Sequence, residues 1–260
     1  MTIITAKNVT LTSMTISHII LASILFFIIS ILYSSVGHAG ASGYLAVMAL
    51  LSFAPETIKP TSLILNVVVA SIASVKYIKA DCFDKRIFLA FILTSLPMAF
   101  VGGYITISAR GFKLIACFFL VVSSLLLLIR AYYKPSPPST KQMPFVYGLI
   151  GGLLIGLISG LIGVGGGIFL SPIIIMANWT SVKKASGVAA LFILFNSLAG
   201  LAGHILALNK LDYNIFYWIV AVLIGALIGS YLGTIKFDNK IIITCLFLVL
   251  LSAGLKFLLI

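Results

Sequence analysis

Two glycine-rich stretches, one in each half of the chain, are the segments whose residue types could best do chemistry. They run over 34–43 and 159–167, and each lies beside a short apolar run, at 40–54 and 166–178. A helix that begins at such a stretch presents free N–H groups and the positive end of its dipole, and glycine lets a ligand oxygen come close to the backbone. The two stretches therefore predict a site for a small anion that needs no arginine.

The side chains that could hold the anion lie in these stretches or shortly after them, and they offer an imidazole, hydroxyls and amides. The predicted substrate-binding residues are Gly37, His38, Gly40, Ala41, Ser42, Thr61, Ser62, Asn66, Gly163, Gly165, Gly166, Gly167, Ser186 and Asn196. A buried serine can instead bond a backbone carbonyl of its own helix. Lys59 and Lys184 precede the hydroxyl residues in the two halves, and each is either an anchor at the membrane interface or a charge that draws anions inward.

Proton coupling would have to use histidine, because all five Asp and Glu residues fall in predicted loops or at the ends of predicted spans. His38 and His204 are the imidazoles placed for that role. Otherwise each is a hydrogen-bonding residue at a helix interface, and the substrate itself carries the proton.

The composition identifies an integral membrane protein. Of 260 residues, 62% are hydrophobic and 8% are charged, and the mean hydropathy is +1.25. A soluble domain has about 25% charged residues, so a soluble enzyme, a disordered chain and a nucleic-acid-binding protein are excluded. Cys82, Cys117 and Cys245 are far apart and form no motif, so we expect no metal, cofactor or disulfide.

We expect an all-α fold with about ten membrane segments, because a helical span needs about 20 apolar residues. Two segments, 40–54 and 166–178, are too short and either cross or re-enter the membrane. The eight full-length runs are 17–36, 61–79, 87–107, 113–133, 144–164, 185–208, 213–235 and 241–259.

A proline-rich polar segment at 134–143 divides the chain. We expect a first membrane repeat at 1–133, with an N-terminal tail at 1–16 that shows no signal-peptide cleavage site, and a second repeat at 144–260. An offset of 125 residues aligns the glycine stretches and also the Lys-x-Thr/Ser motifs that follow them, which indicates an internal repeat.

Five segments per half is an odd number, so the second repeat must enter the membrane inverted. The predicted loops place eleven Lys and Arg residues on the side of the linker and six on the other. The positive-inside rule then puts the linker in the cytoplasm and both termini outside, in the cytoplasmic (inner) membrane of the cell.

Some glycines of the helices, which follow small residues at a spacing of four, are expected only to let helices pack closely. They are Gly148, Gly151, Gly152, Gly156, Gly225 and Gly229.

At these motifs the chain resembles the TauE/SafE sulfite exporter family. The likeness covers nearly the whole length and is strongest over 160–172 and 182–187, with a weaker match over 37–45 and 59–66. The chain departs from the family pattern at 40–42, where most members have a glycine triplet, and at 188–189, where many have hydroxylated residues. The resemblance implies transport of sulfite, organosulfonates or related small anions, commonly outward and coupled to protons.

Two other readings stay open. A passive anion channel or packing subunit would carry similar features, and the string 40–43 matches the GxSG pattern of rhomboid intramembrane proteases, with His204 as a conceivable base for Ser42. A second glycine stretch at the matching place argues against the protease. We therefore expect a non-enzymatic transporter whose partners are a small anion, the lipid bilayer and protons, in an oligomeric state that the sequence leaves open.

Overall fold

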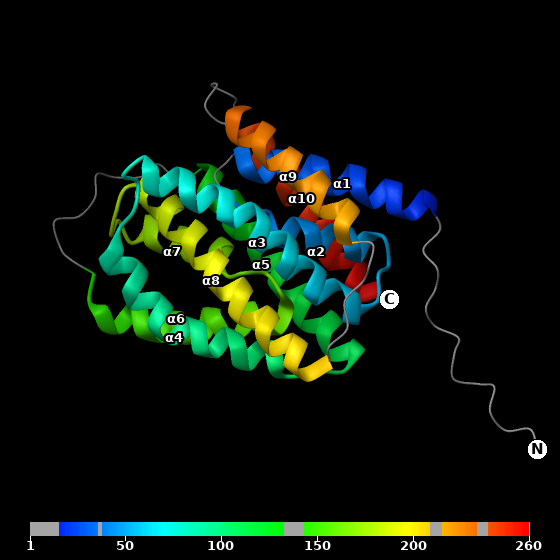
Figure 1. Ribbon diagram of the computed structural model, residues 1–260. Helices are drawn as coiled ribbons and strands as arrows, with labels where there is room; N and C mark the ends of the chain where they lie inside the picture. The colour runs from blue at the N-terminus through cyan, green and yellow to red at the C-terminus, as the bar shows by residue number, and fades with distance from the viewer. Residues whose placement is uncertain (1–15, 36–37, 133–142, 209–214, 233–238, 260) are drawn as a thin grey trace, which may run out of the picture.

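The computed structural model describes residues 16–35, 38–132, 143–208, 215–232 and 239–259, and these form ten helices. Figure 1 shows them as one bundle, with the start of α1 and the end of α10 at the same end of it. The helices are α1 (Ile16–Ser35), α2 (Ala41–Leu50), α3 (Pro55–Lys79), α4 (Lys85–Tyr104), α5 (Ala109–Tyr132), α6 (Phe145–Ile162), α7 (Gly167–Met176), α8 (Val182–Leu208), α9 (Ile215–Leu232) and α10 (Asn239–Leu259).

Seven helices in the described residues are long and apolar enough to cross a membrane: α1, α3, α4, α5, α6, α8 and α9. The prediction of an all-α membrane protein is confirmed. α2 and α7 each have ten residues, and at a rise of 1.5 Å per residue each is about 15 Å long, half of a bilayer core. The two short runs of the sequence are therefore short helices.

One helix begins well before its predicted span. α3 starts at Pro55, where a run beginning at residue 61 was expected, and it contains Pro60. Proline suits the first position of a helix because the N–H that it lacks would have no partner there. Ala54 is extended and its carbonyl accepts from the N–H groups of Thr57 and Ile58. Lys59 therefore lies inside a helix and not in a loop.

The helices pair across the two halves of the chain. The most extensive packing joins α4 to α6 and α1 to α9, so the fourth helix of each half covers the first helix of the other. α3 also crosses α8, and α5 packs along α10. The short helices lie between these layers: α2 contacts α10 and α3, while α7 contacts α8 and α5. Both glycine stretches consequently lie within the bundle.

Glycine allows close approach in the two most extensive of these pairings. A Cβ on Gly152 of α6 would lie 2.1 Å from the carbonyl oxygen of Phe91 in α4, and one on Gly156 would lie 2.3 Å from that of Ser95. In the other pair, a Cβ on Gly229 of α9 would lie 2.3 Å from the carbonyl oxygen of Ile31 in α1. The predicted packing role is confirmed for Gly148, Gly151, Gly152, Gly156, Gly225 and Gly229, each of which faces the partner helix at contact distance.

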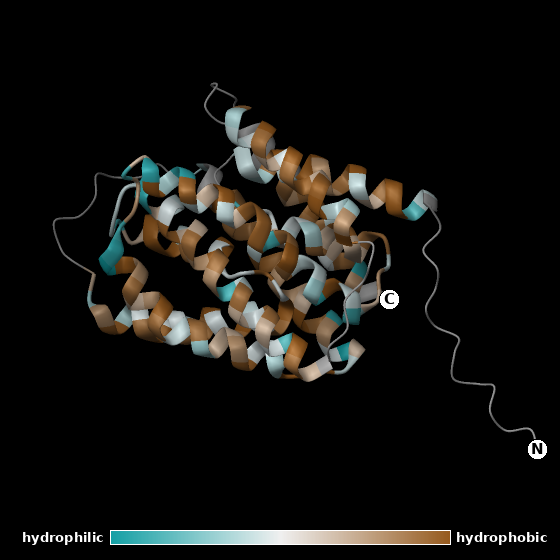
Figure 2. Ribbon diagram, viewed as in Figure 1, coloured by the Kyte–Doolittle hydropathy of each residue, from teal (hydrophilic) through white to brown (hydrophobic). Residues whose placement is uncertain are grey.

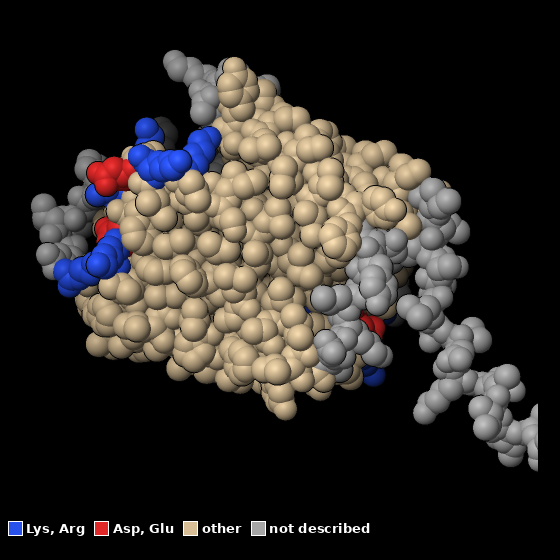
Figure 3. Space-filling view, in the orientation of Figure 1, with Lys and Arg blue, Asp and Glu red and all other residues tan. Residues whose placement is uncertain are grey.

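The surface of the bundle suits a bilayer. Hydrophobic residues predominate along the helices in Figure 2, and many of the large ones are exposed on the outside of the bundle. On the face shown in Figure 3, the described Lys, Arg, Asp and Glu residues gather at the two ends of the molecule, with a broad uncharged band between them. At one end, the exposed cations include Lys79, Lys85, Arg86, Lys183 and Lys184.

Candidate functional site

Left-handed glycines form the turn before each short helix. Gly40 has φ 89° and caps the N-terminus of α2, while Gly165 and Gly166 have φ 75° and 78° and precede α7. Gly163, at the end of α6, has φ 86°. Residues with a Cβ rarely adopt this region, so these turns require glycine. The predicted breaks in the membrane helices are present in both halves.

The turn before α7 leaves a run of backbone amides unpaired. The N–H groups of Gly165, Gly166, Gly167 and Ile168 find no acceptor in the described part of the chain, since the first bonds of α7 run from Phe169 and Leu170 to the Gly166 carbonyl. Buried amides without partners are costly. Four consecutive donors at the positive end of a helix can instead hold an anion.

Three buried side chains with unpaired polar atoms surround the same turn. Asn66 of α3 donates from Nδ2 to the Gly163 carbonyl at 3.4 Å, but its Oδ1 has no partner among the described residues. Ser159 and Ser197 are 0% exposed and their hydroxyls are also unpaired within the described chain. A Cβ on Gly165 would lie 3.0 Å from the Ser197 Oγ and 3.3 Å from the Asn66 Nδ2. The amides and these side chains together form a buried polar cluster whose hydrogen-bonding groups have no partner in the described chain.

The two breaks are joined by one hydrogen-bonded chain. His38, just before α2, shares a hydrogen bond of 3.1 Å between its Nε2 and the Ser171 Oγ of α7. The Ser171 hydroxyl lies 2.8 Å from the Gly167 carbonyl, to which it can donate. In the first break, the Ser42 Oγ lies 2.7 Å from the Tyr33 hydroxyl. All of these side chains are buried, and the bond between His38 and Ser171 links the first break directly to α7.

Other predicted residues lie apart from the α7 turn or make different contacts. Ser186 donates to the Val182 carbonyl of its own helix, and the Asn196 Oδ1 accepts from the Ser95 hydroxyl at 3.0 Å while its Nδ2 is unpaired in the described chain. Thr61 and Ser62 are buried in α3. Ala41 begins α2 and is buried. Gly37 lies outside the described residues.

Sequence reasoning missed Ser159, Ser171, Ser197 and Tyr33. Ser197 follows the predicted Asn196 directly, and consecutive residues of a helix point about 100° apart, so the choice between them needed the orientation of α8. Ser159 was visible as the first residue of the second glycine stretch. Tyr33 and Ser171 carried no signal beyond their nearness to the glycines.

Lys59 is neither an interface anchor nor a free charge. Its side chain is only 7% exposed, and its Nζ donates to the carbonyls of Gly102, Gly103 and Ile105 at the end of α4, at 3.1, 2.8 and 3.4 Å. An ammonium has three N–H donors, so all of them are used. Lys184, in the corresponding place, is exposed.

Two recesses lie at opposite ends of α3. The Lys59 recess, with an empty volume of about 400 Å³, is lined by Glu56, Lys59, Thr106, Leu161 and His204, among others. His204 is buried and its Nε2 has no partner in the described chain. Ser42 instead pairs with Tyr33, so the Ser42–His204 hydrogen bond that a protease would need is not formed.

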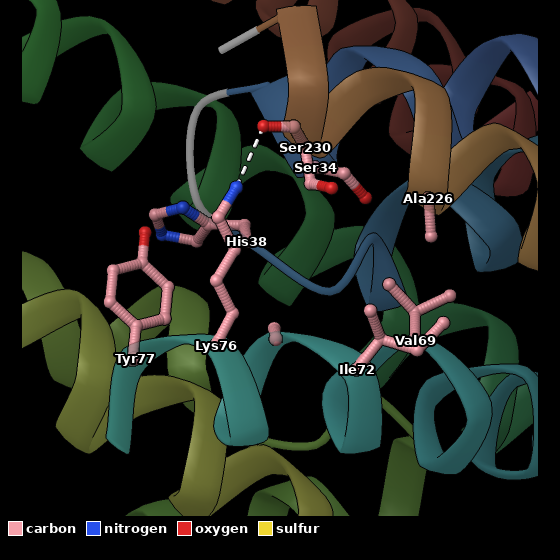
Figure 4. A pocket seen from close by; sticks show the side chains of 9 residues that line it. Ser34, His38, Val69, Ile72, Lys76, Tyr77, Ala226 and Ser230 are labelled. Carbon is pink, nitrogen blue, oxygen red and sulfur yellow. Dashed lines mark hydrogen bonds between the residues drawn. The ribbon is translucent and has the colours of Figure 1, made fainter. Parts of the chain in front are cut away.

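The Lys76 recess lies at the other end of α3, with an empty volume of about 340 Å³ (Figure 4). Its polar lining consists of Ser34, His38, Lys76, Tyr77 and Ser230, from α1, the turn before α2, α3 and α9. Figure 4 shows the Tyr77 hydroxyl and the His38 ring pointing toward one another. Because His38 also bonds Ser171, this recess reaches the broken helices.

A family model described as sulfite exporter TauE/SafE matches residues 22–257. The chain belongs to this family. It is 35% identical to a probable membrane transporter protein of Sinorhizobium fredii, y4hK, over 91% of this chain and 96% of that protein. It is also 28% identical to the probable membrane transporter protein MJ0441 of Methanocaldococcus jannaschii, over 83% of this chain and 84% of the relative.

A third relative is the probable membrane transporter protein YdhB of Bacillus subtilis, 26% identical over 89% of this chain and 97% of that protein. No solved structure gives a significant match. Membership of a membrane transporter family fits the apolar bundle and its interrupted helices, so this TauE/SafE protein is a membrane transporter by family.

Proposed function

We propose that this TauE/SafE protein exports sulfite, an organosulfonate or a related small sulfur-containing anion across the cytoplasmic membrane. The observation that carries the proposal is the turn before α7, where four amides and the hydroxyls of Ser159 and Ser197 lie together without partners among the described residues. A sulfur oxyanion has several acceptor oxygens in a small volume, and these can bind the closely spaced N–H and O–H donors of the turn.

The charge of the cargo needs compensation inside the bundle. The N-terminus of α7 supplies a partial positive charge of roughly half a unit, and the start of α2 supplies a second one. The predicted site residues include no Asp or Glu, so nothing in the site repels an anion. The Asn66 Nδ2 of α3 donates one N–H to the Gly163 carbonyl and can offer its second N–H to the anion.

Alternating access is supported by the pairing of the helices. If the halves of the chain are exchanged, the pair α4 and α6 becomes α9 and α1, and both pairs are among the most extensive in the bundle. The crossings of α3 on α8 and of α5 on α10 exchange into themselves. Such a pattern is consistent with two equivalent halves of five helices each, and the odd number supports an inverted repeat, in which the substrate of a transporter lies at the repeat interface.

In the proposed orientation, 134–143 lies in the cytoplasm and both termini lie outside, which puts the Lys76 recess at the cytoplasmic end of α3 and the Lys59 recess at the outer end. Eleven cationic residues against six support this orientation. His38, between the Lys76 recess and α7, is the proposed proton-coupling residue, with His204 in the Lys59 recess as the second candidate.

The decisive experiment measures flux in proteoliposomes of purified protein. Sulfite, sulfoacetate, taurine and thiosulfate are each offered with and without an imposed pH gradient. Saturable movement of one anion, accumulated against its own gradient when a proton gradient is applied, is the expected result. Flux that never exceeds equilibration would mean a passive channel, and no flux of any of the four would overturn the proposed cargo.

A further inference from the structure

We propose that the Lys76 recess is a second anion-binding site, a vestibule that captures the oxyanion before it reaches the broken helices. This inference rests on the proposed function for its cargo, and it adds a site whose residues lie mostly outside the glycine stretches. The chemical class of its ligand is a sulfonate, sulfite or sulfate group.

The first support is the state of the Lys76 ammonium. It donates one hydrogen bond, of 2.8 Å, to the Ser230 carbonyl near the end of α9. Three donors are available on an ammonium, so two remain for a ligand. The bond to Ser230 also holds the charge at the wall of the recess, where Figure 4 shows it above His38.

The second support is the rest of the lining. Hydroxyl groups of Ser34, Tyr77 and Ser230 line the recess, and the buried Ser34 Oγ has no partner in the described chain. Among the residues that the structure describes, no Asp or Glu lines it. A cation, hydroxyls and an imidazole without a carboxylate favour an anion over a cation or a neutral solute.

The recess at the other end of α3 gives the contrast. It also contains a lysine, but all three donors of Lys59 go to carbonyls at the end of α4, and Glu56 lines the same recess. An anion there would find no free ammonium donor and would meet a carboxylate. The two ends of α3 are therefore unequal, and the capture site lies at the Lys76 end.

The position of His38 connects the vestibule to the central site. His38 lines the recess and bonds the Ser171 hydroxyl of α7, which lies one helical turn from the unpaired amide of Gly167. An anion held by Lys76 thus has a short polar route to the α7 N-terminus, past His38.

The test measures local electrostatics without requiring transport. Ser230→Cys is introduced after Cys82, Cys117 and Cys245 are replaced by alanine, and the rates of labelling are compared for a sulfonate-bearing and a trimethylammonium-bearing methanethiosulfonate reagent. Lys76→Gln should lower the ratio of anionic to cationic rates by about threefold to tenfold, the effect of removing one unit charge a few ångströms away. Lys76→Arg, which keeps the charge, should preserve the ratio.

Lys79→Gln is the matched control, because Lys79 is also exposed in the last turn of α3 but does not line the recess. An equal fall in the Lys79→Gln protein, or an unchanged ratio in Lys76→Gln, would overturn the vestibule. Millimolar inorganic sulfate should slow the anionic labelling of the Ser230→Cys protein, because it occupies the recess and neutralises Lys76, and should lose that effect in Lys76→Gln.

The outcomes separate this inference from the proposed function. A Lys76-dependent labelling ratio and sulfate protection, in a protein that moves none of the four anions, would support the vestibule and overturn the cargo. Transport of one anion with a labelling ratio and a KM that Lys76→Gln leaves unchanged would support the cargo and overturn the vestibule. If both hold, Lys76→Gln should raise the KM for anion offered at the cytoplasmic side and leave the maximal rate unchanged.

Discussion

Lys59 and Lys76 stand at the two ends of α3, and each donates to carbonyls at the C-terminal end of the fourth helix of a half. Lys59 bonds the end of α4, and Lys76 bonds the end of α9. A cation at a helix C-terminus compensates the partial negative charge there and satisfies carbonyls that have no partner in the helix. α3 is therefore bonded to the C-terminal ends of both α4 and α9. Three hydrogen bonds of Lys59 join it to the end of α4, and one hydrogen bond of Lys76 joins it to α9.

Lys59→Met should destabilise the folded protein by about 2 kcal/mol or more, because it removes charged hydrogen bonds from three carbonyls at a buried position. Unfolding in detergent, followed by fluorescence on heating, measures the loss. Lys184→Met is the matched control, because Lys184 occupies the aligned place in the second half and is exposed. Equal effects in the two variants would contradict the assigned role of Lys59.

Removing the hydroxyls of Ser159 and Ser197 should lower the efficiency of anion transport, kcat/KM, and leave the thermal stability of the protein unchanged. Neither hydroxyl has a partner in the described chain, so Ser159→Ala and Ser197→Ala break no bond of the resting fold. Each should reduce kcat/KM by about tenfold, the equivalent of one hydrogen bond to the anion. Initial rates in proteoliposomes check this.

Ser124→Ala serves as the control for those variants, since the buried Ser124 donates to the Val121 carbonyl within α5. Normal transport by both Ser159→Ala and Ser197→Ala would remove these residues from the site.

The glycines of the turn are less suitable for testing the site. A Cβ on Gly166 would lie 2.8 Å from Ile155 and 2.9 Å from Phe192, at φ 78°, so Gly166→Leu would strain the fold as well as the site.

His38→Gln should uncouple transport from the proton gradient. Glutamine can keep a hydrogen bond to the Ser171 Oγ, now 3.1 Å from the His38 Nε2, but it cannot take up a proton. The expected result is anion flux that persists yet no longer accelerates when a pH gradient is imposed. His204→Gln is tested in parallel, and an intact gradient response in both variants would mean that the anion itself carries the proton.

Gly152→Ala should destabilise the pairing of α6 with α4. The added Cβ would lie 2.1 Å from the Phe91 carbonyl oxygen, which forces the helices apart and costs about 1–3 kcal/mol. Gly111→Ala is the control: within the described chain the only neighbour of its Cβ would be the Ser108 Oγ at 3.2 Å, and alanine favours a helix over glycine by up to about 1 kcal/mol. The midpoint of thermal unfolding should fall for the first variant and hold or rise for the second.

The sequence was sufficient to predict an all-α membrane protein with two short helices; eight full-length runs were expected, and seven helices of the described residues are long and apolar enough to span a membrane. Apolar runs and the two glycine stretches placed α2 and α7 within a few residues of their observed bounds. The close-packing glycines could be recognised from their spacing of four, because that spacing puts small residues on one face of a helix.

The sequence was less informative about which polar groups face one another. Lys59 and Lys184 align in the two halves, yet one is buried and the other exposed, because α3 begins four residues before Lys59 and α8 begins two residues before Lys184. The bond between His38 and Ser171 joins residues 133 apart, and no local pattern specifies it. Such contacts depend on how the two halves are packed, which residue spacing does not encode.

The exchange of partners between the halves has a consequence for how the protein is made. α1 packs mainly against α9, and α4 against α6, so the glycine-lined seams of the early helices stay open until later helices arrive. During synthesis the membrane must therefore hold eight helices before the first of them gains its main neighbour. Truncation before α9 should therefore leave α1 without its main neighbour, while α4 can still pack on α6 and α3 on α8.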